Sequence, residues 1–318
     1  MTRSVVFGTG QIGRLVATRL VDAGHDVTVV SRSGRGVAPG ASLHAGDATD
    51  PEFTTRVSRG ADTVYFCLNA TNYARWGEEF PPLQRGVLAG AEAAGARLVA
   101  LENMYAYGPT AGVDLVETLP PRPSSSKAAA RATMTTELLD AHRAGRIEVA
   151  IGRASDFFGP GVTASALGEA VFGAAVGGRV AQLMGDPDLP HSYSYAPDVA
   201  AGLVMLGTQP EAAGSVWHLP VAPATTTRQL VADVYRLAGH RPRLMAAGAP
   251  TLRLVGIVKP GLREYLHTLY QFTDRWVVDD SRFRSAFAVE ATPLDQALAD
   301  TVRWYTERAR ITDGVATG

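Results

Sequence analysis

Apolar residues in the first half of the chain follow two patterns that alternate. Short apolar runs, bounded by glycine or charged residues, indicate buried strands, and segments with apolar residues three or four positions apart indicate helices. Gly24 and Gly95 come where two of the helical patterns end, as expected after a helix C-terminus. The predicted strands lie at residues 5–7, 27–30, 62–68, 97–101 and 147–152, and the predicted helices at residues 12–20, 78–94 and 124–144.

This alternation predicts the class of the fold. Strands with little charge, separated by helices, are typical of a parallel sheet that helices cover on both faces. The pattern loosens after Gly161, where helices are expected at residues 163–175, 198–207, 225–237, 250–273 and 294–308, and short strands at 179–184 and 216–219. We therefore expect an α/β fold, a Rossmann-type doubly wound parallel sheet with a smaller C-terminal lobe. The sheet domain is expected to span residues 1–160 with returns near 191–220, and residues 161–318 mainly the lobe and the C-terminal helices.

A glycine turn joins the first predicted strand to the first predicted helix. Gly8, Gly10 and Gly13 have the spacing that binds dinucleotides when it follows a strand and opens a helix. Gly8 would allow the tight turn, Gly10 would let a pyrophosphate approach the backbone, and Gly13 would let the helix pack closely on the strand. The phosphates would lie at the positive N-terminal end of the helix. The predicted cofactor residues here are Gly8, Thr9, Gly10, Gln11, Ile12 and Gly13.

The end of the second strand predicts which dinucleotide binds. An NAD site usually has an acid there, for the ribose 2′-hydroxyl, whereas this chain has Ser31, Arg32 and Ser33. Arg32 could form a forked pair with a 2′-phosphate, so we expect NADP(H) to be preferred over NAD(H). Alternatively, Arg32 is a solvated loop residue, and Arg35 could reach as well.

Asp47, followed by Ala48, is the next cofactor candidate. Its carboxylate, just past a strand, could accept a hydrogen bond from an adenine amino group. The alternative is a helix N-cap role, which Thr49 or Asp50 could serve equally well.

Composition and charge exclude several classes of function. The 318 residues carry a net charge of −1, which implies no strongly basic face for nucleic acid. The single cysteine, Cys67, leaves no internal disulfide or cysteine-based zinc site. No apolar stretch approaches the roughly 20 residues of a membrane span. We therefore predict a cytoplasmic protein that binds a small-molecule substrate, with no metal, nucleic acid or membrane as partner.

Several segments together resemble the extended short-chain dehydrogenase/reductase superfamily, in the NAD-dependent epimerase/dehydratase branch. The resemblance covers nearly the whole chain and implies the Rossmann-type fold with a substrate-binding lobe. It also implies that the helices at 78–94 and 124–144 could form a homodimer. The residues that carry it are Gly8 to Gly13, Gly46-Asp47, Tyr107-Gly108-Pro109, Lys127, Arg153 to Gly161, Tyr195 to Ala200, Thr292-Pro293-Leu294 and Trp304-Tyr305.

The same resemblance implies a catalytic apparatus from which this chain departs. In the family a Ser or Thr and a Tyr-x-x-x-Lys pair act on the substrate, and the lysine holds the nicotinamide ribose. Here Lys127 is present, but Pro123 stands at the tyrosine position and Asn103 at the serine position. The chain thus resembles an atypical member that lacks the usual tyrosine. Tyr105 is the leading candidate for the proton donor, with Tyr193 and His191 as alternatives, so the predicted catalytic residues are Tyr105, Lys127 and Asn103.

Three functions remain open from these residues. The first is an NADP-dependent reductase that transfers hydride to a medium-sized, fairly hydrophobic carbonyl, enone or imine metabolite. The second is a dinucleotide-binding redox sensor without catalysis, and the third is a sugar-nucleotide epimerase or dehydratase. Few positive charges converge at the strand ends, which disfavours a substrate with a diphosphate. The nicotinamide end is expected at Leu68, Asn69 and Ala70, and the substrate at Trp76, Met104, Tyr105, Asp156, Phe157, His191 and Tyr193.

Overall fold

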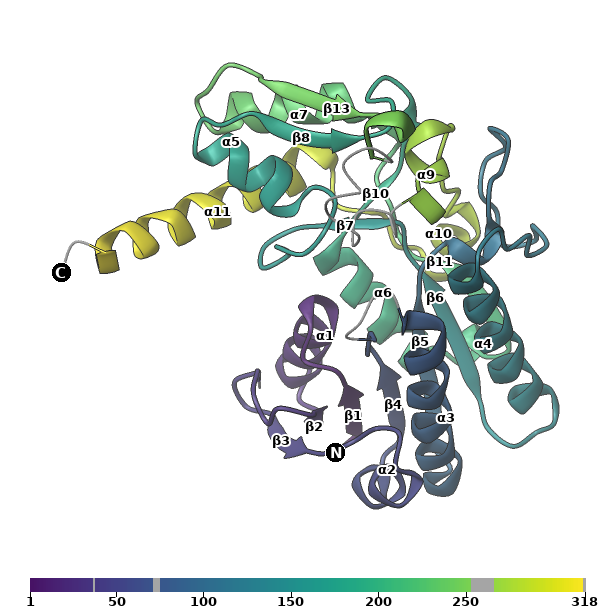
Figure 1. The fold of residues 1–318 in the computed structure, drawn as a ribbon. Coiled ribbons are helices and arrows are strands. Elements are labelled where there is room, and N and C mark those ends of the chain that lie inside the picture. The colour runs from purple at the N-terminus through teal and green to yellow at the C-terminus, as the bar shows by residue number, and fades with distance from the viewer. Residues whose placement is uncertain (37, 71–74, 253–265, 317–318) are drawn as a thin grey trace. The chain divides into compact units, whose positions relative to one another are not determined.

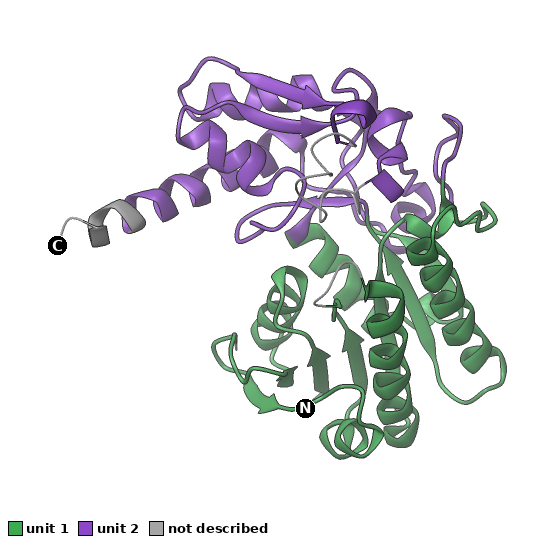
Figure 2. Cartoon of the chain, viewed as in Figure 1, with its two compact units in different colours: residues 1–108, 117–154, 197–219 green, residues 109–116, 155–196, 220–318 purple. Residues whose placement is uncertain are grey.

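Two compact units make up the chain in the computed structural model, which describes residues 1–36, 38–70, 75–252 and 266–316. The first unit comprises Met1–Gly108, Glu117–Ala154 and Pro197–Leu219 (Figure 2). The second comprises Pro109–Val116, Ser155–Ala196 and Pro220–Gly318. Compared with the division expected at residue 160, the long N-terminal part of the first unit ends at Ala154, and residues 109–116 join the second unit.

A seven-stranded sheet forms the centre of the first unit (Figure 1). All of its neighbouring strands are parallel, in the order β11-β6-β5-β4-β1-β2-β3, which confirms the predicted doubly wound sheet. Phe7 at the end of β1 is in register with Val30 on β2 and Phe66 on β4, so three strand ends meet at one edge. The strands are β1 Arg3–Phe7, β2 Asp26–Ser31, β3 Ser42–Ala45, β4 Thr63–Phe66, β5 Arg97–Glu102, β6 Val149–Arg153 and β11 Ser215–His218.

Helices cover both faces of this sheet because successive strand residues point to opposite sides. On β4, Val64 and Phe66 pack in a core with residues of α2, α3 and α4. The alternate residue Thr63 donates from its hydroxyl to the Gly207 carbonyl of α6, at 3.4 Å. The helices of the first unit are α1 Gln11–Asp22, α2 Pro51–Ser58, α3 Trp76–Ala94, α4 Ser126–Arg143 and α6 Ala196–Thr208, with short helical turns η2 Tyr105–Tyr107 and η4 Pro210–Ala212.

The helix ends follow the local sequence. Helix α3 begins at Trp76, two residues before the expected start, and stops before Gly95, whose φ of 64° favours glycine. Helix α4 is capped by Ser125, whose hydroxyl accepts from the Ala128 N–H at 3.2 Å.

The second unit is built from small sheets and helices around its own core. Its aromatic centre stacks Phe158 on Phe172 and Phe172 on Tyr305. The strand pairs are β7 Asp156–Phe158 with β10 Tyr193–Tyr195, β8 Ala181–Met184 with β13 Leu244–Ala247, and β9 Pro190–His191 with β12 Thr225–Thr226. The helices are η3 Gly168–Gly173, α5 Ala174–Val176, α7 Thr227–Leu237, α9 Tyr270–Thr273, α10 Ser281–Phe287 and α11 Leu294–Ala316.

The helix expected at residues 163–175 is shorter and wound differently. It consists of a six-residue π-helix, η3, and the three-residue helix α5. A Cβ on Gly168 would lie 2.2 Å from the Thr163 carbonyl oxygen, and Gly168 N–H bonds to the Ser165 hydroxyl at 3.0 Å. This close approach of the backbone replaces the first turns of the expected helix. Of the helix expected at residues 250–273, residues 253–265 lie outside the described part.

No helix in the described part of the chain is long and apolar enough to cross a membrane.

Candidate active site

The glycine turn after β1 has the conformation that its sequence predicts. Gly8 has a φ of +117°, and a Cβ there would lie 2.6 Å from the Cys67 carbonyl oxygen. A Cβ on Gly13 would lie 2.1 Å from the Gly8 carbonyl oxygen, so α1 packs directly on the turn. Both positions therefore require glycine.

Gly10 differs from Gly8 and Gly13 because a Cβ there would meet no atom of the described residues within 4 Å, apart from its chain neighbours and its own helix. Gly10 is also the N-cap of α1, and within the described part of the chain its side of the helix has no side-chain cap bond. Exposed N–H groups at the positive end of a helix are the donors that a pyrophosphate needs. The turn therefore fits a dinucleotide.

A cavity of about 530 Å³ adjoins the glycine turn. Its wall comes from the turns after β1 and β4, from the end of β2 and the turn after it, from the loop before α2 and from α3. Of the predicted cofactor residues, Gln11, Ile12, Gly13 and Lys127 are not among the described residues of this wall. Those that the structure brings together are Gly8, Thr9, Gly10, Ser31, Arg32, Ser33, Asp47, Ala48, Leu68, Asn69 and Ala70.

The polar cofactor candidates of this wall, which follow β2 and precede α2, have different surroundings. Arg32 and Ser33 are exposed, whereas Ser31 is buried and its hydroxyl donates to the Arg35 carbonyl at 3.1 Å. Asp47 accepts from the Thr49 N–H at 2.9 Å. The N-cap of α2 is Asp50, which accepts from the Glu52 N–H, so Asp47 does not cap the helix.

Seven cavity residues were not among the predicted site residues: Val30, Gly46, Thr49, Cys67, Glu79, Pro82 and Leu83. Burial raises the pKa of the Cys67 thiol to about 12, so the thiol stays protonated at neutral pH. Glu79, Pro82 and Leu83 lie in the first turns of α3. The sequence could have predicted Glu79, Pro82 and Leu83 as cavity residues, because a helix that follows a sheet strand begins at that strand's carboxyl end.

Asn103 and Tyr105 form a turn at the end of β5. The Asn103 side-chain oxygen accepts from the Tyr105 N–H at 3.1 Å. The Tyr105 ring is partly buried and lies 6.0 Å from the Trp76 ring between centroids. Trp76 in turn donates from its indole N–H to the Asn69 side-chain oxygen at 2.7 Å. Asn69 belongs to the cavity wall, so this contact links the cavity to Tyr105.

Lys127 and Met104 are buried rather than solvated. Lys127, in the first turn of α4, is 3% exposed, so it is not a solvated lysine at the start of a helix. Met104 is buried between Asn103 and Tyr105. The buried lysine near the start of α4 and the η2 turn packed on α4 belong to the same unit.

The second unit brings Asp156 and His191 together. His191 Nδ1 lies 3.1 Å from the Gln271 carbonyl oxygen, and its Nε2 lies 2.9 Å from Asp156 Oδ2. A carbonyl oxygen only accepts, so Nδ1 is the donor in the bond to Gln271. The imidazole is stacked between the Tyr193 and Phe272 rings, so it is held in this orientation. Asp156 is the more exposed member of this hydrogen-bonded pair.

The remaining lobe candidates are placed differently. Tyr193 is buried, and its hydroxyl bonds to the Thr227 hydroxyl at 2.7 Å. Burial also raises the pKa of Tyr193 far above that of an exposed tyrosine, which makes it a poor proton donor. Phe157, on β7, is partly buried.

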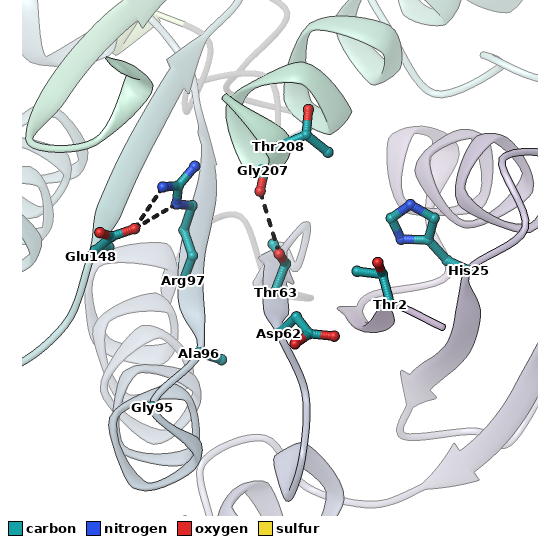
Figure 3. Close-up of a pocket in the computed structure, with 10 residues that line it drawn as sticks. All are labelled: Thr2, His25, Asp62, Thr63, Gly95, Ala96, Arg97, Glu148, Gly207 and Thr208. Carbon is teal, nitrogen blue, oxygen red and sulfur yellow. Dashed lines mark hydrogen bonds and ion pairs between the residues drawn. The ribbon is translucent and has the colours of Figure 1, made fainter. Parts of the chain in front are cut away.

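A second cavity, of about 540 Å³, lies at the opposite, amino-terminal edge of the sheet (Figure 3). Its charged side chains bond to the protein itself. Arg97 pairs with Glu148 at 2.6 Å, and Asp62 accepts from the Arg3 N–H at 2.7 Å. Because Arg97, Glu148 and Asp62 are already bonded within the protein, the carboxyl edge of the sheet, with its open glycine turn, is the better candidate for a ligand site.

Comparisons with known proteins agree with this placement. Residues 5–219 match the NAD dependent epimerase/dehydratase family. The chain is 28% identical over 273 residues to a UDP-glucose 4-epimerase of Streptomyces lividans, which covers 76% of this chain and 83% of the relative.

Among solved structures, the fold is similar to two sugar-nucleotide enzymes. A UDP-glucose 4-epimerase from Thermotoga maritima with UDP-glucose superposes with a TM-score of 0.81 at 17% identity, covering 97% of this chain and all of that one. A dTDP-glucose 4,6-dehydratase from Bacillus anthracis in complex with NAD gives a TM-score of 0.79 at 15% identity and covers 98% of each chain. At these identities the likeness shows the fold. The family match spans the glycine turn, the sheet and the cavity, and the chain therefore belongs to the NAD-dependent epimerase/dehydratase family.

Proposed function

We propose that the protein is an NADP(H)-dependent reductase that transfers hydride to a medium-sized, fairly hydrophobic carbonyl, enone or imine, and that Tyr105 donates the proton. The observation that carries the cofactor preference is the exposed Arg32 on the cavity wall, directly after β2. A planar guanidinium there suits a 2′-phosphate, whereas the acid expected for an NAD ribose is absent from that strand end. A cytoplasmic location and a homodimer stay predictions.

Each residue of the site would have a separate role in binding the dinucleotide or in transferring the proton. A bound NADPH supplies the hydride. Gly8 and Gly10 admit the pyrophosphate, Arg32 holds the 2′-phosphate, and Asn69 lies beside Trp76 and so near Tyr105. Tyr105 then gives its phenolic proton to the substrate heteroatom as negative charge develops there.

A proton donor other than the usual tyrosine is needed, because Pro123 occupies the position four residues before Lys127 and has no O–H group. Pro123 is exposed and precedes the Ser125 cap of α4. Among the described tyrosines, Tyr105 is the partly exposed one nearest to Pro123 along the chain, since Tyr107 is buried. Asn103 fixes the turn that presents Tyr105.

Sugar-nucleotide epimerisation is the second candidate. It is favoured by the 28% identity to the Streptomyces lividans UDP-glucose 4-epimerase. Both candidates require hydride transfer, and they differ in substrate and in whether the dinucleotide is consumed.

A substrate panel distinguishes the candidates. We expect stoichiometric NADPH oxidation with an apolar aldehyde, ketone, enone or cyclic imine, and none with UDP-glucose or dTDP-glucose. Tyr105→Phe should lower kcat by about a hundredfold or more, since a positioned general acid contributes about 10² to 10⁴. Tyr65→Phe is the matched control, because the Tyr65 hydroxyl is buried without a hydrogen-bond partner in the described part of the chain. Turnover of a sugar nucleotide without net NADPH consumption would replace the proposal by the second candidate, and unchanged kcat in Tyr105→Phe would remove Tyr105 from its role.

A further inference from the structure

One face of helix α4 buries polar side chains at regular spacing. Lys127, Arg131 and Thr135 follow one another at four-residue intervals, and only 3%, 2% and 6% of their respective surfaces are exposed. Residues four apart in a helix lie on the same side. This face therefore carries two cations into the interior of the first unit, toward the ends of β5 and β6.

Arg131 is held mainly by aromatic rings. Its guanidinium carbon lies 4.7 Å from the Phe80 ring centroid and 5.6 Å from the Trp76 ring centroid. Its Nη2 donates to the Leu101 carbonyl at 3.1 Å. Its Nε and Nη1 are buried without a hydrogen-bond partner in the described residues.

The Glu102 carboxylate bonds directly to Thr135 and Arg153, and it acts on Arg131 through its charge. Glu102 Oε2 accepts from the Thr135 hydroxyl at 2.7 Å and lies 3.3 Å from Arg153 Nε. Both Arg131 and Arg153 are buried, so two guanidinium groups share one carboxylate. A buried cation without full compensation is costly and strongly favours any negative charge that forms beside it.

Tyr105 lies where such a charge would form. Its turn, η2, packs on α4, and the Ala106 carbonyl accepts from the Arg122 N–H just before that helix, at 3.0 Å. Both side chains lie against the Trp76 ring: the Tyr105 ring centroid is 6.0 Å from the Trp76 centroid, and the Arg131 guanidinium carbon is 5.6 Å from it. Burial lowers the pKa of Arg131; of the neighbouring charges, Glu102 raises that pKa, Arg153 lowers it, and Tyr105 raises it when ionised. The interaction between two charges is mutual, so Arg131 favours the ionised phenol equally.

We propose that Arg131 is the positioning residue that stabilises the phenolate of Tyr105, in addition to the Lys127 ammonium that the family arrangement provides. The inference rests on the proposed function in taking Tyr105 as the proton donor. In the reduction step, hydride from NADPH forms the new C–H bond while the C=O or C=N π electrons move to the heteroatom. That heteroatom takes the Tyr105 proton, NADP⁺ is released, and the phenolate regains a proton from water.

Other charged groups of the same unit lie near the η2 turn that carries this phenol. Lys127 comes from the first turn of α4, and Glu102 from β5 and Arg153 from β6 act on Tyr107 of the same turn. Glu102 is the group among them that opposes ionisation of the phenol. Arg153 is directed elsewhere, with its guanidinium carbon 4.7 Å from the Tyr107 ring centroid.

The test is a pH titration of the Tyr105 ring carbon by NMR, in protein labelled at tyrosine and without cofactor. The chain has 10 tyrosines, so the Tyr105 signal is assigned as the one missing in Tyr105→Phe. We expect its midpoint below the ordinary value of about 10. In Arg131→Met the acid dissociation constant of this phenol should fall about ten- to hundredfold, the usual effect of losing a neighbouring guanidinium. Arg131→Lys should keep most of the effect.

Arg85→Met is the matched control, because Arg85 is an exposed arginine that pairs with Glu137 on the outer side of α4. It should leave the Tyr105 midpoint unchanged. If Arg131→Met does not fold, Arg131→Gln is titrated in its place. An unchanged midpoint in the folded variant overturns the inference, whether or not the protein reduces any substrate. Absence of turnover in the substrate panel with a shifted midpoint overturns the proposed function alone.

Discussion

Single residues of the glycine turn could be predicted because their roles depend on local backbone geometry. The conformations expected of Gly8 and Gly13 from their spacing are confirmed by the positive φ of one and the close packing of both. Arg131 could not be found in this way. Its neighbours in sequence are mostly alanines, and its environment is made by Trp76 and Phe80 of another helix. Its four-residue spacing from Lys127 was the one local signal.

Substitutions in the glycine turn should separate ligand binding from stability. Gly13→Ala places a methyl group 2.1 Å from a backbone oxygen and should cost about 1–3 kcal/mol in the free energy of unfolding. Gly10→Ala meets no atom of the described residues beyond its chain neighbours and its own helix and should leave stability unchanged, but should weaken dinucleotide binding at least about tenfold, since the methyl group occupies the space of the pyrophosphate. Urea unfolding and fluorescence titration measure the two effects. Equal binding by Gly10→Ala and the wild type would contradict the placement of the phosphates.

Cys67 is a built-in probe of the cavity. Only the thiolate reacts with a disulfide reagent, and the thiol has a pKa of about 12. The rate should therefore be slow at neutral pH and rise about tenfold per pH unit on the way to that pKa. Saturating dinucleotide should slow the reaction, because Cys67 lies in the cavity wall. The single cysteine leaves no other site to react, so a rate that is independent of pH or of dinucleotide would count against this environment.

At the scale of elements, the sequence predicted the sheet well and the second unit less well. Periodicity identifies β4, β5 and β6, because a strand buried on both faces is apolar throughout. Helix α4 was predicted from its alanines and its apolar side with Met134 and Leu138, but it also buries the polar residues Lys127, Arg131 and Thr135, which sequence alone places in solvent. The expected helix at residues 163–175 became a π-helix because the backbone of Gly168 approaches Thr163, a tertiary contact that periodicity does not encode.

The polar face of α4 should be a large source of stability in the first unit. Glu102→Gln removes the carboxylate that Arg131 and Arg153 share, and leaving buried cations unpaired should cost about 3–5 kcal/mol in the free energy of unfolding. Glu148→Gln is the control, since its pair with Arg97 is largely exposed on the Glu148 side and should be worth less than about 1 kcal/mol. Chemical denaturation of both variants checks the difference, and equal losses would show that Glu102 is not the essential counter-charge.

At the scale of the whole molecule, the family match and the cavity agree on the same part of the chain. Residues 5–219 carry the family similarity, and the glycine turn and the strand ends that form the cavity fall within them. The family could be recognised from the sequence because its motifs lie at the strand ends, where ligands bind in this fold. The second unit holds the Asp156–His191 pair, which depends on segments 35 residues apart and could not be paired from sequence.

The most direct test of the account is a fluorescence titration of the wild type with NADPH and NADH, beside Arg32→Ala and Arg35→Ala. Losing a forked, charge-assisted pair should cost about 1.5–3 kcal/mol, or roughly ten- to a hundredfold in affinity. We expect the wild type to prefer NADPH by at least this factor, Arg32→Ala to lose the preference while keeping its NADH affinity, and Arg35→Ala to retain it. Equal affinity of the wild type for the two dinucleotides, or a preference that survives in Arg32→Ala, would contradict the proposed cofactor site.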